Sequence, residues 1–166
     1  DLYCPDELAE IVLRGAGVLN IDVQPAAAME IALRSRGTPR VAIRLLKRVR
    51  DVAAVGNRSS IDAGLAKSAL EMLSIDHSGL DEGDRKLLRA LIELFSGGPV
   101  GLATLAAALN EEQQTVEDIY EPFLIRKGLI ERTPRGRRAT PSAFEYLGLA
   151  APAGYGRQIG LLEGLE

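Results

Sequence analysis

Residues 37–51 read GTPRVAIRLLKRVRD and place an arginine where a helix begins. Gly37 can close a preceding helix with a positive φ, Thr38 can cap the next helix, and Pro39 suits its first position. Arg40 then falls in the first turn, where free N–H groups and the helix dipole already carry partial positive charge. An arginine there indicates that an anion shares the site, and a nucleotide phosphate is the obvious candidate.

Apolar residues on either side of this stretch recur at helical spacing. In the helix after Gly37 they are Val41, Leu45, Val49 and Val52. The opposite side of that helix is polar and carries Arg40, Arg44, Lys47 and Asp51. We expect three further helices: one from the Asp6 cap to the glycines at residues 15 and 17, one from Pro25 and one from the Asp62 cap. Together they predict a four-helix bundle over residues 1–74.

A second domain is expected over residues 80–149, after a linker at 75–79 that gathers turn-forming residues. Its first helix begins at Asp81 and ends at the sequence GGP (97–99). A short helix at 102–109 and a longer one from Thr115 follow, the latter with a capping box over 115–118. Pro122 is expected to kink the longer helix or to end its first half near Glu121.

Two strand-like pieces, 129–133 and 138–140, flank the sequence PRGR at 134–137. Three helices and a β-hairpin make a winged helix, so the fold class is mainly α. The remaining segment, 150–166, is rich in alanine, glycine and proline, and we expect it to be disordered and assign it no role.

Charge is distributed unevenly over the 166 residues, although the formal net charge is only −3. One basic segment without an acidic residue contains Arg34, Arg36, Arg40, Arg44, Lys47, Arg48 and Arg50. A second contains Arg132, Arg135, Arg137 and Arg138. Both are local basic patches on a mildly acidic chain, and the second lies on the predicted hairpin, or wing.

The wing is a better candidate than a helix for contacting DNA. In a helix-turn-helix that reads bases, the second helix presents hydrogen-bond donors in the major groove. Here that helix carries Glu117, Asp118 and Glu121, whose carboxylates would face phosphates. We therefore expect the wing arginines to grip phosphates, which supplies affinity without sequence information.

Other functions find little support in the residues. No apolar run approaches the ~20 residues needed to cross a membrane, and the cytoplasm is the expected compartment. The single cysteine, Cys4, cannot form an internal disulfide or a zinc site alone, and no metal site is expected. No serine, cysteine or carboxylate pair is arranged with a base, since Cys4 and His77 lie far apart, so we expect no catalytic residue. The phosphate-loop pattern G-x-x-x-x-G-K-[ST] does not occur, so this chain alone should not hydrolyse ATP.

Several blocks resemble the RuvB family of AAA+ ATPases, the motors that migrate Holliday junctions in recombination and DNA repair. They are GTPR (37–40), LD and DRKLL (80–81 and 84–88), GGPVGL (97–102), EPFLI (121–125) and RTPRGR (132–137). The resemblance implies the C-terminal half of such a motor: an AAA+ lid followed by a winged-helix head. It also implies ATP with Mg bound mainly by an ATPase portion outside this sequence, a hexameric ring, and a partner, RuvA, that docks on that portion.

The resemblance assigns roles to individual residues. Arg40 matches the sensor-2 arginine that contacts nucleotide phosphates and couples the nucleotide state to lid movement, and Tyr3 is expected near the base. Arg132 and Arg137 match the DNA-contacting wing arginines, with Arg135 and Arg138 beside them. A further family DNA contact, an arginine, aligns with Gln113, which can hydrogen-bond a phosphate but cannot neutralise it.

Two other interpretations remain open. One is a winged-helix transcription regulator whose N-terminal bundle dimerises, although the acidic residues at 117–121 count against a base-reading helix. The other is a self-contained enzyme, but no arrangement of residues in the sequence supports it. For Arg44, Lys47 and Arg48 the plainer interpretation is a solvated helix face.

Overall fold

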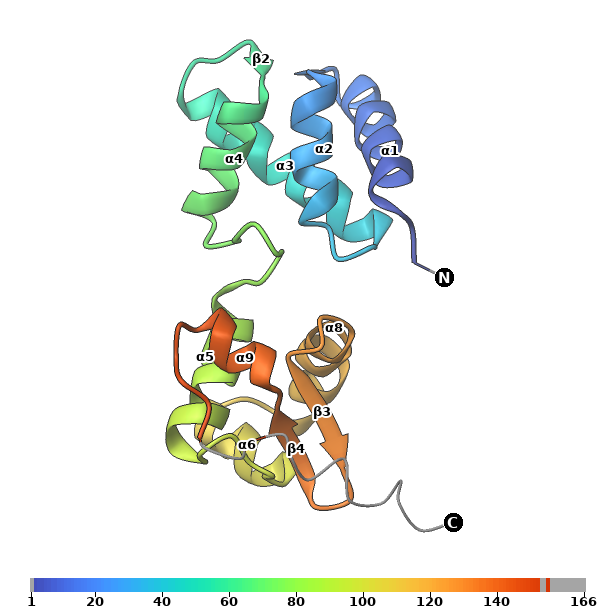
Figure 1. Cartoon of the computed structure of the whole chain (residues 1–166). Coiled ribbons are helices and arrows are strands. Elements are labelled where there is room, and N and C mark those ends of the chain that lie inside the picture. Colours follow the sequence, from blue (N-terminus) through green and yellow to red (C-terminus); the bar gives the residue numbers. More distant parts are fainter. Residues whose placement is uncertain (1, 153–154, 156–166) are drawn as a thin grey trace, which may run out of the picture. The chain divides into compact units, whose positions relative to one another are not determined.

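The computed structural model describes residues 2–152 and 155. The chain forms two compact units, one ending at Glu82 and the other starting at Gly83. Figure 1 shows helices α1–α4 in the first unit and α5, α6, α8, α9 and the β3–β4 hairpin in the second. Among the residues described, none of the helices is long and apolar enough to cross a bilayer.

The first unit is the predicted four-helix bundle. Its helices are α1 (Pro5–Val18), α2 (Pro25–Leu33), α3 (Pro39–Val55) and α4 (Ala63–Met72). Helix α1 packs on α2 and α3, and α4 packs on the same two helices. A short parallel pair of strands, β1 (Asp22–Val23) and β2 (Ser60–Ile61), joins the two inter-helix loops.

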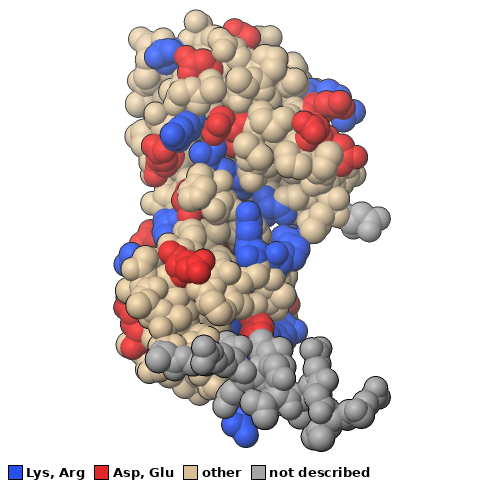
Figure 2. Space-filling model, viewed as in Figure 1, with Lys and Arg blue, Asp and Glu red and all other residues tan. Residues whose placement is uncertain are grey.

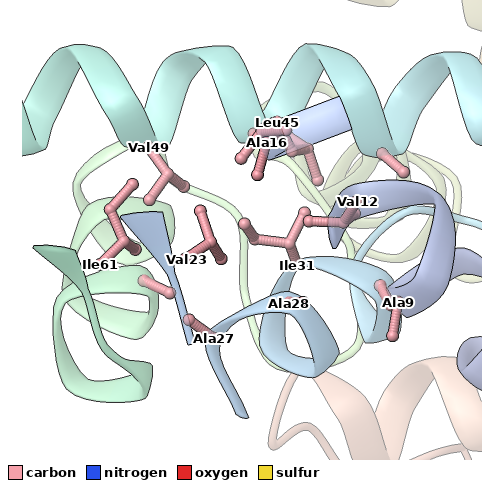
Figure 3. Packing of buried hydrophobic residues seen from close by; sticks show 14 of the residues in the cluster. Ala9, Val12, Ala16, Val23, Ala27, Ala28, Ile31, Leu45, Val49 and Ile61 are labelled. Carbon is pink, nitrogen blue, oxygen red and sulfur yellow. The ribbon is translucent and has the colours of Figure 1, made fainter. Parts of the chain in front are cut away.

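The bundle core is aliphatic and contains many alanines. In Figure 3, Val23 and Ile61 from the two short strands point toward Val49 of α3 and Ile31 of α2. Of the apolar stripe predicted on α3, Leu45 and Val49 are buried, and the two outer valines are partly buried. Each fully buried aliphatic side chain contributes about 1.5–3 kcal/mol, so this stripe fixes α3 and the arginine at its start.

Helix α1 runs through its glycines, so the prediction that they end it is wrong. The helix continues to Val18 because α1 and α3 approach closely at Gly15, where a Cβ atom would lie 2.5 Å from Cδ1 of Ile43. Its N-cap is Cys4 rather than Asp6, and the backbone N–H of Cys4 donates to the Glu7 carboxylate at 2.8 Å. That hydrogen bond lowers the pKa of Glu7.

The segment expected as a linker belongs to the first unit and is hydrogen-bonded to the residues that follow α2. The Arg34 side chain is buried, and its Nε donates to the Asp76 carbonyl at 3.1 Å. Arg36 donates to the Gly79 carbonyl at 3.2 Å and to the Asp81 carboxylate at 2.7 Å. Residues 76–81 therefore fold back onto the residues at the end of α2 and do not form an extended connection.

The second unit is the predicted winged helix. Helix α5 (Glu82–Arg89) continues as one π-helical turn (Ala90–Leu94), and α6 (Leu102–Leu109) follows. The next helical run comprises α7 (Gln113–Thr115), a π-helical turn (Val116–Tyr120) and α8 (Glu121–Arg126). The wing pairs β3 (Ile130–Thr133) with β4 (Gly136–Ala139), and α9 (Pro141–Tyr146) follows it.

Several local expectations for this unit need correction. Strand β4 begins at Gly136 instead of residue 138, so the hairpin loop is shorter than predicted, and α9 was not predicted. Thr115 makes no capping hydrogen bond, because it lies inside a helical run that begins at Gln113. At Pro122 the helical run does not end: the π-helical turn passes directly into α8 at Glu121, with the proline in the first turn of α8.

Gly136 permits a close backbone approach at the base of the wing. Its φ is +129°, and an added Cβ would lie 2.2 Å from the Val100 carbonyl oxygen. We expect Gly136→Ala to lower the free energy of unfolding by about 2–3 kcal/mol, because backbone must move and the φ is strained. Thermal and urea unfolding of the 166-residue chain would measure this loss. Gly101→Ala, where a Cβ meets nothing within 4 Å, is the control and should cost less than about 1 kcal/mol.

One residue beyond residue 152 is described, Tyr155. Its hydroxyl lies 2.7 Å from the Gly97 carbonyl oxygen and 3.0 Å from that of Ala139, and its ring meets Phe144 edge-on at 4.8 Å. Burial raises the pKa of this tyrosine. The chain thus returns to the winged helix at Tyr155, while most of the tail predicted as disordered lies outside the described residues.

Candidate nucleic-acid interface

Two of the four wing arginines converge on one buried carboxylate. Arg132 places Nε 2.7 Å and an Nη 2.6 Å from Glu121 Oε2. Arg137 places Nε 2.5 Å from Glu121 Oε1 and an Nη 3.3 Å from Oε2. The Glu121 side chain is fully buried, whereas that of Arg132 is half exposed. This carboxylate therefore fixes two guanidinium groups in the wing, that of Arg132 half exposed and that of Arg137 only 15% exposed.

The local fold explains why these charges meet. Arg132 and Arg137 are direct cross-strand partners in the β3–β4 ladder, where two like charges alone would repel. Backbone hydrogen bonds between Val100 and Arg137 anchor β4 from its other side. Glu121 begins α8, beneath the wing, and a buried carboxylate needs such charged partners. The charges of this cluster depend on one another: the carboxylate offsets the repulsion between the two arginines, and the arginines offset the cost of burying the carboxylate.

The carboxylates of the second helix have different surroundings, which corrects the expectation that all three face phosphates. Glu121 points inward to the arginines. Glu117 is 41% exposed, and its Oε1 lies 3.5 Å from Arg132 and 3.8 Å from Arg137. Asp118 instead accepts a hydrogen bond from Gln114 at 2.7 Å.

The other two wing arginines differ from this pair. Arg138 pairs with Glu131, its cross-strand partner, and like Arg137 it is mostly buried. Arg135 occupies the hairpin loop, and its side chain is exposed with no ion pair in the described part of the chain. Gln113, the remaining predicted DNA contact, is an exposed residue at the start of α7. DNA contact by these residues stays a prediction.

The start of α3, where the sequence predicts a nucleotide phosphate, has the expected backbone geometry, and nucleotide contact there stays a prediction. Gly37 has φ +74°, Thr38 is the N-cap without a side-chain capping bond, and Arg40 is exposed in the first turn. An open pocket of about 480 Å³ is lined by Pro39, Arg40, Ile43, Arg44 and Lys47. The backbone N–H of Tyr3 donates to the Gly37 carbonyl at 3.0 Å, which brings Tyr3 to the same end of the bundle.

The first basic segment is smaller as a surface patch than its sequence indicates. Arg34 and Arg36 bind groups of the first unit, and Arg50 pairs with Asp51. Exposed cations without an ion pair among residues 2–152 are Arg40, Arg44, Lys47 and Arg48 of this segment. On the face in view in Figure 2, both units carry acidic as well as basic side chains. Within the described ranges, no three His, Cys, Asp or Glu residues gather where they could hold a metal ion.

A four-helix lid followed by a winged helix with an arginine-rich wing defines the C-terminal domains of an AAA+ protein. Residues 3–76 match the family model for the RuvB AAA lid domain, and residues 77–148 match the RuvB C-terminal winged helix domain. The chain belongs to the RuvB family, as its sequence blocks predicted.

Similar proteins agree with this assignment. The Holliday junction branch migration complex subunit RuvB of Lawsonia intracellularis is 54% identical over 149 residues, which are 90% of this chain and 44% of that protein. The same subunit of Chloroflexus aurantiacus is 56% identical over 150 residues, 90% of this chain and 43% of its own. The solved Thermotoga maritima RuvB Holliday junction branch migration motor superposes with a TM-score of 0.86 at 47% identity, covering 92% of this chain and 51% of that one. The chain thus spans about half, or slightly less, of the relatives that it matches.

Proposed function

We propose that this chain is the nucleotide-sensing lid and the DNA-holding head of an ATP-driven motor that migrates Holliday junctions. The observation that carries this proposal is the pair of cross-strand arginines, Arg132 and Arg137, held in place by the buried Glu121 on a RuvB-type winged helix. Guanidinium groups fixed in this way suit phosphate oxygens, because little side-chain freedom remains to be lost on binding.

The head binds DNA without reading sequence. The half-exposed Arg132 and the exposed Arg135 offer cations to phosphates, with Arg137, Arg138 and Gln113 as further contacts. The second helix, by contrast, presents Glu117 and Asp118, which repel phosphates and donate nothing to base edges. Backbone binding suits a motor that must move along any sequence. A sequence-reading regulator, the alternative, finds no support among the relatives.

The lid reports the state of a bound nucleotide. Arg40, Arg44 and Lys47 line the open pocket at the start of α3, and among the described residues no carboxylate lines it, which fits a phosphate group. Arg40 contacts the phosphates, and Tyr3 lies near the base. ATP and its Mg are bound mainly by an ATPase portion, and ATP supplies the free energy for movement.

The partners follow from the relatives, which are named as subunits of a branch migration complex. The complete protein works as a hexameric ring of its own copies in the cytoplasm, where it acts in recombination and DNA repair. RuvA delivers it to the junction by contacting the ATPase portion, so the present chain contacts DNA and not RuvA.

A binding titration with the 166-residue chain tests the head's role. We expect equal affinity for duplexes of unrelated sequence, because the contacts are to phosphates. The logarithm of the affinity should fall linearly with the logarithm of the salt concentration, with a slope between about −1.8, for two neutralised phosphates, and about −3.6, for one phosphate at each of the four wing arginines. Fluorescence anisotropy on two labelled duplexes at four salt concentrations provides both quantities. A clear preference for one sequence would favour the regulator instead.

A further inference from the structure

Two glutamates contact the same two wing arginines, but in different ways. Glu121 is fully buried and makes close hydrogen bonds to both guanidinium groups. Glu117 is 41% exposed, and the 3.5 and 3.8 Å separations of its Oε1 from those groups are too long for hydrogen bonds. The arginines thus have one tight acidic partner inside the domain and one loose acidic partner at its surface.

We propose that the two glutamates have opposite effects on DNA binding. Glu121 is a positioning residue, which holds Arg132 and Arg137 in the geometry that a phosphate needs. Glu117 is a competitor: its carboxylate occupies the place beside the arginines that a DNA phosphate takes, and the phosphate displaces it. This inference rests on the proposed role of the wing in binding DNA.

Burial and distance determine which carboxylate can be displaced. An exposed ion pair contributes little, because water and salt screen it, so Glu117 can give way to a phosphate at small cost. Glu121 cannot leave, because a buried carboxylate stripped of its charged partners would be strongly destabilising. A guanidinium group has five N–H donors, so an arginine bound to Glu121 through Nε and one Nη retains donors for a phosphate.

The arrangement would weaken each DNA contact without removing it. When a phosphate arrives, Glu117 must separate from both arginines, and when the phosphate leaves, Glu117 returns to them. A motor that steps along DNA needs such release. Glu117 thus lowers the affinity of the wing for DNA. Its neighbour Asp118 accepts a hydrogen bond from Gln114 and has no such effect.

The test compares three isosteric variants of the 166-residue chain in anisotropy titrations with a labelled 30-base-pair duplex at low salt. We expect Glu117→Gln to bind about fivefold more tightly, because the competing ion pair is removed. We expect Glu121→Gln to bind about tenfold more weakly, although it too removes a negative charge. Asp118→Asn, the matched control, should change the affinity less than Glu117→Gln does.

Two further measurements distinguish positioning from simple stability. The tightening by Glu117→Gln should shrink as salt rises, since salt screens the exposed pair. In a chain that already carries Arg132→Gln and Arg137→Gln, whose amide groups can still donate to the buried Glu121, Glu117→Gln should not alter DNA affinity. Circular dichroism at the assay temperature shows whether Glu121→Gln and the double arginine variant are folded. If Glu121→Gln is not folded, the comparison of Glu117→Gln with Asp118→Asn still tests the competition.

Two results would overturn the inference alone. Equal tightening by Glu117→Gln and Asp118→Asn would reduce the effect to net charge, and tighter binding by folded Glu121→Gln would remove its positioning role. If instead the double arginine variant binds as well as the unchanged chain, the wing is not the DNA interface. That outcome would contradict the proposed function as well.

Discussion

Replacing Arg137 by alanine is expected to weaken the binding of the 166-residue chain to duplex DNA and to a four-way junction by the same factor, about tenfold or more. The substitution removes one phosphate-binding cation, and it also takes from Glu121 one of its two partners. Binding should become less salt-dependent, with the log–log slope reduced by about 0.9 for each phosphate that the chain no longer neutralises. Anisotropy titrations of both DNA forms over a salt series measure the two effects together.

Arg50→Ala is the matched control for this result. It removes an arginine that is also in an ion pair, with Asp51, but it lies on α3, far along the chain from the wing. Its affinity and salt slope should equal those of the unchanged chain. If Arg137→Ala keeps both values while it remains folded, the wing does not contact phosphates and the proposed head function is wrong.

Arg40→Ala should have the second large effect, in the complete protein. We expect ATP hydrolysis to fall by about 100-fold or more, as when a preorganised group that stabilises transition-state charge is removed. The DNA affinity of the 166-residue chain should not change, because Arg40 lies at the start of α3 and not on the wing. Steady-state phosphate release by the complete protein, with DNA and RuvA present, measures the rate of ATP hydrolysis.

The control for Arg40 is one helical turn away. Arg44 is exposed and lines the same pocket, but it is outside the first turn of α3. Arg44→Ala should keep most of the turnover if the position at the helix start matters more than the local charge. Normal hydrolysis by Arg40→Ala would refute the sensor role, whereas equal losses for both variants would assign the effect to the basic pocket as a whole.

Much of the fold could be predicted from residues that act locally. Proline at the first helical position and aspartate at the N-cap both favour a helix start when apolar residues follow at helical spacing. Pro25, Pro39 and Asp62 mark helix starts in this way. The errors arose where contacts with a distant part of the chain determine the local structure. Gly15 would end a helix by propensity, but it lies against Ile43 of α3, and that packing keeps it inside α1.

The sequence was enough to predict the cations of the candidate site, but not the carboxylate that binds them. The cluster RTPRGR identifies the wing arginines, whereas Glu121 is 11 and 16 residues away from the arginines that it binds. One signal was present: a hairpin centred on Pro134 and Arg135 places Arg132 opposite Arg137. Two like charges facing each other across strands require an acid nearby, and the EPFLI block supplies it.

The hydrogen bonds from Arg34 and Arg36 to residues 76–81, all within the first unit, decide where this chain can be divided for expression. The two family matches meet at residues 76 and 77, but a lid piece cut there would lack the Gly79 carbonyl and the Asp81 carboxylate that Arg36 binds. A piece that extends to Glu82 keeps them. The amide protons of Ser78 and Leu80, both bonded to Asp76, should then exchange slowly with deuterium, as part of the lid and not as a tether.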